Sequence, residues 1–170
     1  MPFEQAAREF FSLRSRVHLN ILLWGPGVSA STYAMRLSIK GYIEREFDDV
    51  HDVRLPEDPE LKAIFENPVG DEVDEELNQA LVANVIIALD ISQGVGEEIS
   101  RFSSYERIAH KMFLLSPKKY YNTKSMPRAF RNGLKIFWYT DEQYTEQFLG
   151  AICKHHIENE MTKTFGHLPY

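Results

Sequence analysis

Two adjacent glutamates, Glu97 and Glu98, follow a short polar loop that contains Gly94 and Gly96. The loop leaves an apolar run at residues 85–89 that is bounded by turn residues, a pattern typical of a central parallel strand covered on both faces. The glutamates would then stand in the first turn of a helix, where free backbone N–H groups and the helix dipole keep a carboxylate ionised. Such a carboxylate suits nucleophilic or electrostatic work at a sugar carbon. Plain helix capping is the alternative interpretation, because acids are common in first helical turns.

A second glycine turn, Gly25-Pro26-Gly27, follows the first strong apolar run, residues 18–24. Strand, glycine loop and helix in this order open a doubly wound fold, and the loop offers free N–H groups to an anion or a polar ligand. The turn lacks the Gly-Lys-Ser/Thr of a Walker loop and the three glycines of the dinucleotide fingerprint. It therefore indicates a polar ligand without specifying one, and an ordinary tight turn is the alternative.

The rest of the chain must position these two loops, and its apolar periodicity predicts strands that alternate with helices. We expect strands at residues 18–24, 51–55, 85–89, 111–115 and 134–139. We expect helices at residues 2–16, 32–47, 72–83, 97–109 and 141–164, with a helical turn at 60–65 and a loose tail to residue 170. This alternation predicts one domain, residues 1–170, of the α/β class. It would be a flavodoxin-like, Rossmann-type three-layer sandwich whose five parallel strands stand in the order 2-1-3-4-5.

A long polar passage, residues 56–74, separates the second predicted strand from the next helix and is rich in prolines and acids. Loops of this length inside a compact domain are usually functional, so we expect an active-site lid here. The helix that follows begins with a run of acids that ends at Glu76, which suits a helix N-terminus.

The composition, 44% hydrophobic and 26% charged over 170 residues, is that of an ordinary globular domain. A net charge of −6 without an offsetting basic patch argues against a nucleic-acid partner. The single cysteine, Cys153, fits a reducing compartment, and no apolar stretch is long enough to cross a bilayer, so we expect a cytoplasmic protein. His155 and His156 would point to different sides of a helix, and the sequence predicts neither a metal site nor a cofactor.

Three segments together resemble the nucleoside 2-deoxyribosyltransferases and, more loosely, the wider set that includes TIR domains and SLOG-type nucleotide-binding domains. The segments are the turn at 25–27, the stretch from Glu76 to residue 87, and the stretch from Asp90 to residue 99. The resemblance covers roughly residues 18–116. It implies that Glu98 is the nucleophile on the anomeric carbon and that Glu76 is the acid that assists the base. It also implies a sugar site lined by Gly25, Pro26, Gly27, Asp90, Ser92, Gly94 and Gly96.

The chemistry explains why two acids are wanted. Cleavage of an N-glycosidic bond passes through an oxocarbenium-like state, so one carboxylate stabilises or traps the sugar while a second group assists departure of the base. We therefore expect cleavage or transfer of this bond on a nucleoside, deoxynucleotide or NAD-like nucleotide. A catalytically silent nucleotide-binding or sensing module of the same fold is the alternative, because the transferases carry aspartate at the position of Glu76 and an acid near Ser92.

The resemblance also bears on assembly, because the transferases are oligomers whose subunits complete one another's active sites, in part through the C-terminal end. This chain ends in an apolar tip, residues 168–170, after a Gly-His hinge. The amphipathic helix expected at residues 2–16 offers a second surface for self-association. We expect a homo-oligomer, at least a dimer, in which Tyr170 reaches a neighbouring pocket.

Overall fold

The computed structural model describes residues 1–25, 27, 32–66, 69–70, 72–89, 99, 101–121 and 134–166. Several of the residues expected to bind or react lie outside these ranges. They are Pro26, Asp90, Ser92, Gly94, Gly96, Glu98 and Tyr170.

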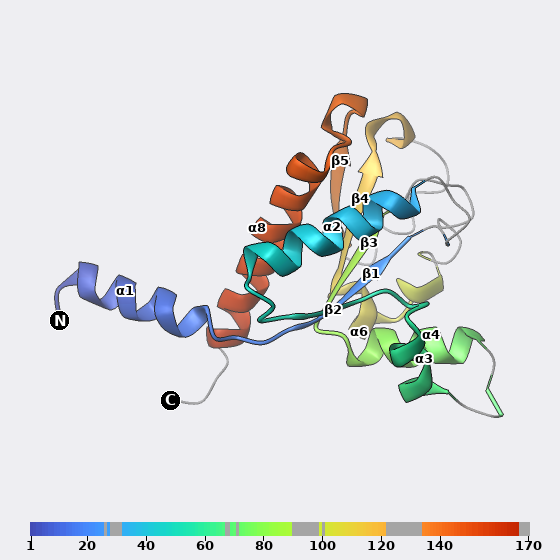
Figure 1. Cartoon of the computed structure of the whole chain (residues 1–170), viewed down its shortest axis with the longest axis horizontal. Helices are drawn as coiled ribbons and strands as arrows, with labels where there is room; N and C mark the ends of the chain where they lie inside the picture. Colours follow the sequence, from blue (N-terminus) through green and yellow to red (C-terminus); the bar gives the residue numbers. More distant parts are fainter. Residues whose placement is uncertain are drawn as a thin grey trace.

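The centre of the fold is a five-stranded, all-parallel sheet in the order β2-β1-β3-β4-β5, which confirms the predicted class and strand order (Figure 1). The strands are β1 Asn20–Trp24, β2 Asp52–Arg54, β3 Val85–Leu89, β4 Met112–Pro117 and β5 Lys135–Tyr139. Strand β1 pairs with β2 on one side and with β3 on the other, so successive strands are added to opposite sides of β1. In doubly wound sheets this reversal creates a crevice at the carboxyl ends of the two strands, here β1 and β3.

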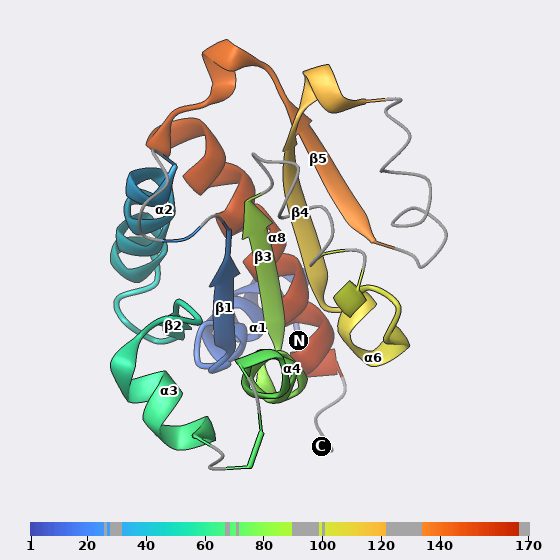
Figure 2. The ribbon, with the colours of Figure 1, turned by 90° about the vertical axis from the view of Figure 1, so that its right-hand side faces the viewer.

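Helices cover both faces of the sheet and complete three layers. The helices are α1 Phe3–Arg14, α2 Tyr33–Glu46, α3 Pro59–Phe65, α4 Glu72–Val82, α6 Glu106–Ala109 and α8 Glu146–Gly166. Figure 2 shows α8 and α2 on one face, with α4 and α6 on the opposite face. Short 3-10 turns, η1 Lys118–Tyr120 and η2 Asp141–Gln143, follow the carboxyl ends of β4 and β5.

Strand β1 shows how the sequence divides the core in two. Ile21 and Leu23 point into the cluster formed with α2 and α8, whereas Leu22 and Trp24 point into the cluster formed with α4 and α6. Successive side chains of a strand point to opposite faces, so an unbroken apolar run is what a strand buried on both sides requires. All four side chains are at most 8% exposed.

The helix expected at residues 97–109 is interrupted in the part that the structure describes. Residues 101–102 are helical, Ser103 and Ser104 form a turn, and α6 starts only at Glu106. The Ser104 hydroxyl donates to the Arg101 carbonyl oxygen at 2.6 Å, and Tyr105 adopts an extended conformation. Serine side chains that bond nearby backbone groups offer the chain an alternative to the helical ladder, which explains the break.

The helix expected at residues 141–164 is likewise divided, into η2 and α8. Thr140 caps η2 in a capping box with Gln143, and the chain leaves the helical conformation at Tyr144. The Phe148 N–H donates to the Thr145 hydroxyl at 3.2 Å, so Thr145 caps the new helix. Two caps five residues apart therefore favour two helices over one.

The long passage at residues 56–74 contains α3, which includes the helical turn expected at 60–65. Figure 2 shows α3 beside the amino-terminal end of β1, next to α4. The helix therefore does not cover the carboxyl ends of the strands, where a lid was expected. Among the described residues, no helix is long and apolar enough to cross a membrane.

Candidate functional site

The crevice between β1 and β3 is the place where this fold presents ligands. Trp24 pairs with Ala88 at the carboxyl ends of the two strands, and Gly25 and Leu89 are the next residues of each. We call the end of the sheet formed by these residues the carboxyl edge. Of the expected site residues, the structure describes three, Gly25, Gly27 and Glu76.

The backbone at Gly25 is approached so closely that a side chain would not fit. A Cβ atom at this position would lie 2.7 Å from Cδ of Arg36 and 3.2 Å from the carbonyl oxygen of Leu89. By contrast, a Cβ atom at Gly27 would have no described atom within 4 Å. Gly25 is therefore needed for close packing of β1, β3 and α2, whereas Gly27 borders open space.

Arg36 is the residue of this edge that the sequence did not reveal. It lies in the first turn of α2 and is only 2% exposed, and its guanidinium forms an ion pair with Glu57. Its Nη1 also donates to the Leu23 carbonyl oxygen at 3.4 Å, and the guanidinium lies 5.2 Å from the ring centre of Tyr33. A buried charge needs such partners, because removing it from water is otherwise costly. Arg36 thus fastens α2 and residue 57 to the carboxyl end of β1.

The buried face of α2 includes the charged Arg36 and leaves out an apolar neighbour, Leu37, which is 45% exposed. The buried residues are Arg36, Ile39 and Ile43, which recur at helical spacing. Arg36 precedes the two isoleucines by three and seven residues and therefore shares their face of the helix.

One donor of Arg36 remains without a partner. Its buried Nε has no hydrogen-bond acceptor among the described residues. Buried donors are nearly always satisfied in native proteins. The Nε–H of Arg36 is therefore a buried donor for which the described residues supply no acceptor.

Glu76 lies on α4 and is half buried. Gln79, one helical turn further on, donates from Nε2 to the Pro56 carbonyl oxygen at 3.3 Å. Pro56 precedes Glu57, the partner of Arg36. Residues three apart on a helix share a face, so the face of α4 that carries Glu76 also contacts the segment that anchors Arg36.

The segment that contains Glu98 re-enters the described structure at Ile99. This residue is helical and 3% exposed, and it belongs to the same apolar cluster as Trp24 and Phe102. The rings of Trp24 and Phe102 lie 4.5 Å apart. The carboxyl end of β1 is therefore packed against the helical residues Ile99 and Phe102.

The other reactive groups of the described residues do not form a site. Burial raises the pKa of the Cys153 thiol to about 12, which leaves it protonated and unreactive. The described ranges contain no group of three or more histidine, cysteine, aspartate or glutamate side chains that could hold a metal ion.

The strand order defines the class of the protein, a flavodoxin-like α/β fold. At the crevice between β1 and β3 this chain carries a closely packed glycine, Gly25. No protein-family model and no curated protein matches its sequence.

Proposed function

We propose that the chain binds a nucleoside or nucleotide at the carboxyl edge and cleaves or transfers its N-glycosidic bond. The observation that carries the proposal is the reversal of strand order at β1 and β3, at whose carboxyl ends folds of this class bind their ligands. Gly25 lies at this point, where Arg36 and the Leu89 carbonyl oxygen pack closely against the end of β1.

In this proposal Glu98 is the nucleophile or electrostatic stabiliser of the sugar, and Glu76 assists departure of the base. Ile99, which follows Glu98 in sequence, is buried against the carboxyl end of β1. Glu76 lies one helical turn before Gln79, which donates to the Pro56 carbonyl oxygen. One carboxylate would then stabilise the positive charge of the oxocarbenium-like sugar, while the other assists departure of the base.

The test is incubation of the purified protein with nucleosides, deoxynucleotides and NAD, with the released base measured by chromatography. We expect base release from at least one of them, and its loss in Glu98→Gln. No release from any compound by correctly folded protein would refute catalysis. A nucleotide that binds tightly to both proteins and is recovered intact would support the silent binding module instead.

We also propose that the chain self-associates through α1. This helix has no buried residue, and Figure 1 shows it projecting away from the sheet. Its exposed apolar side chains include Phe3 at 91% and Phe11 at 55% exposure. Such surface is characteristic of an interaction site.

A further inference from the structure

Glu57 lies next to the carboxyl edge, and the chemistry proposed above gives it no role. It follows three residues after the end of β2, whose last residue, Arg54, stands opposite Leu22 of β1. Nη1 of Arg36 donates both to the Leu23 carbonyl oxygen, at 3.4 Å, and to Oε2 of Glu57, at 3.5 Å. Because one nitrogen reaches both acceptors, the Glu57 carboxylate stands beside the carboxyl end of β1.

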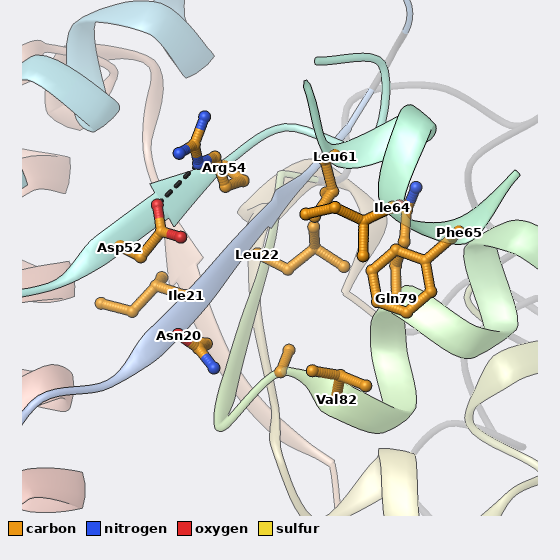
Figure 3. Close-up of a pocket in the computed structure, with 11 residues that line it drawn as sticks. Asn20, Ile21, Leu22, Asp52, Arg54, Leu61, Ile64, Phe65, Gln79 and Val82 are labelled. Atoms are coloured by element: carbon orange, nitrogen blue, oxygen red, sulfur yellow. Dashed lines mark hydrogen bonds and ion pairs between the residues drawn. The ribbon is translucent and has the colours of Figure 1, made fainter. Parts of the chain in front are cut away.

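The segment that carries Glu57 is held on both sides of this residue. Gln79 of α4, labelled in Figure 3, donates from Nε2 to the Pro56 carbonyl oxygen at 3.3 Å. On the other side, Oδ2 of Asp58 accepts a hydrogen bond from the Leu55 N–H at 2.9 Å. A carboxylate on such a braced segment is preorganised, so it can bind a ligand at a low cost in conformational entropy.

The Glu57 carboxylate keeps hydrogen-bonding capacity that Arg36 does not use. Two carboxylate oxygens offer about four lone-pair positions, and the guanidinium approaches them with two nitrogens. The side chain of Glu57 is 26% exposed, whereas that of Arg36 is only 2% exposed. The part of this ion pair that a ligand can reach is therefore the acceptor and not the cation.

Two other cations near this segment are also engaged by acids. Arg54 donates from Nε to Asp52, a bond drawn in Figure 3, and from Nη1 to Glu60, each at 2.6 Å. Lys40 faces Asp58 at 3.8 Å. Glu57 therefore presents an acceptor without a free cation supplied by these residues, which suits a neutral O–H donor and disfavours a phosphate group.

We propose that Glu57 accepts hydrogen bonds from the 2′- and 3′-hydroxyls of a ribose, so that the ligand of the carboxyl edge is a ribonucleoside or ribonucleotide and not its 2′-deoxy form. In dinucleotide-binding doubly wound sheets, an acid beyond the glycine turn accepts from the ribose 2′-hydroxyl, whereas an arginine accommodates a 2′-phosphate. Here the arginine is buried and paired with the acid, which favours the hydroxyl. The inference rests on the nucleoside binding proposed above but not on cleavage of the bond.

The test compares adenosine, guanosine, cytidine and uridine with their 2′-deoxy counterparts by isothermal titration calorimetry. Hydrogen bonds to a charged group support a discrimination of about 10- to 100-fold, so we expect at least one ribonucleoside to bind more tightly by this factor. Adenosine 2′-monophosphate should bind about tenfold more weakly than the 5′-monophosphate, which carries the same charge away from the 2′-oxygen. Base release is measured separately by chromatography, and Glu98→Gln replaces the unmodified chain in titrations where release occurs.

Two variants locate the discrimination. Glu57→Asp withdraws the carboxylate by one methylene and keeps its charge, so the preference for ribose should fall to about twofold or less. Glu60→Asp is the matched control, since Glu60 is 78% exposed and pairs with Arg54, and it should keep the preference.

Equal binding of ribonucleosides and 2′-deoxynucleosides to the unmodified chain would overturn the inference, as would binding of neither or an unchanged preference in Glu57→Asp. Because the first comparison needs no variant at Glu57, it holds even if that variant does not fold. Ribose-selective binding without base release would refute the proposed cleavage and support the role of Glu57.

Discussion

Cδ of Arg36 occupies the space that a side chain at Gly25 would need, 2.7 Å from the position of its Cβ. The guanidinium of Arg36 is fixed by Glu57, so the stem cannot simply swing aside. We expect Gly25→Ala to lower the free energy of unfolding by about 1–3 kcal/mol, the usual cost of overpacking. Urea denaturation followed by circular dichroism measures this change.

Gly27→Ala is the matched control, since a Cβ there meets no described atom within 4 Å. Its effect on the free energy of unfolding should stay within about 0.5 kcal/mol. Equal destabilisation by the two substitutions would show that the contact between Gly25 and Arg36 is not what restricts the glycine.

The Arg36–Glu57 ion pair makes a second prediction. Glu57→Gln leaves a guanidinium that is 2% exposed without its counter-charge. Breaking a buried pair costs more than removing it, and the 26% exposure of Glu57 moderates the loss, so we expect about 2–3 kcal/mol.

The double variant Arg36→Met, Glu57→Gln serves as the control in the same denaturation experiment. It removes the charge together with its partner, so it should be more stable than Glu57→Gln alone. Arg36→Met alone is measured as well. If the double variant loses as much free energy of unfolding as Arg36→Met and Glu57→Gln lose together, the two residues do not interact.

Much of the fold could be predicted from the sequence, because burial on two faces leaves a distinct pattern. The run at Val85–Leu89 is apolar throughout and bounded by turn residues, and it forms β3 with those bounds. The alternation of such runs with helices, together with right-handed crossovers, limits the strand order to a few doubly wound arrangements, of which the structure has 2-1-3-4-5. These predictions depend only on local periodicity and on general rules of connection.

The inward direction of Arg36 could not be predicted in the same way. Periodicity assigns a charged side chain of a helix to solvent, and only the approach of Glu57, 21 residues away, makes its burial possible. The break at Ser104 also escaped, because a serine within a helical pattern is compatible with either outcome. The burial of Arg36 depends on a partner that is distant in sequence. The helix break at Ser104 depends on a side chain that competes for backbone hydrogen bonds.

Acid should destabilise the protein through two buried histidines. Burial lowers the pKa of His51 and of His156 to about 4, below the value of about 6.5 expected in the unfolded chain. Above pH 6.5 both states are neutral and these groups have no effect. As the pH falls from 6.5 towards 4, only the unfolded state takes up protons, so stability is lost in this window. The loss should be on the order of 2–3 kcal/mol per histidine.

Urea denaturation at pH 7.5, 6 and 5 measures this loss. His156 stacks on Phe113 with ring centres 4.2 Å apart, and Leu fits such an apolar position. His156→Leu should therefore reduce the dependence on pH between 6.5 and 5 by about half. An unchanged slope in this variant would assign the acid sensitivity to other groups.

Activity should depend on one of the two adjacent glutamates. Under the proposed function, Glu98→Ala abolishes base release while it changes the free energy of unfolding by no more than about 1 kcal/mol, because the sequence predicts that it removes a single charge in a first helical turn. Glu97→Ala, the neighbouring control, should retain most of the activity. The reverse result, in which only Glu97→Ala is inactive, would move the nucleophile to Glu97.

Self-association through α1 gives the last prediction. A helix of 12 residues is marginal in water on its own, and the ring contact and hydrogen bond that join α1 to α8 lie at the C-terminal end of α1. There the rings of Phe10 and Phe165 lie 5.4 Å apart, and Arg14 donates to Thr162 at 3.5 Å. The remaining apolar surface of the helix would be covered by a second copy of the chain. Light scattering should therefore give at least twice the 19.8 kDa mass of one chain.

The variant Phe3→Ser, Phe11→Ser should give the mass of a single chain with an unchanged circular dichroism spectrum, because both side chains are exposed. Leu37→Ser is the control, since Leu37 is a similarly exposed apolar residue on α2, and it should leave the assembly intact. A mass of 19.8 kDa for the unmodified protein at micromolar concentration would contradict self-association. An oligomer that survives both replacements in α1 would place the interface on another surface.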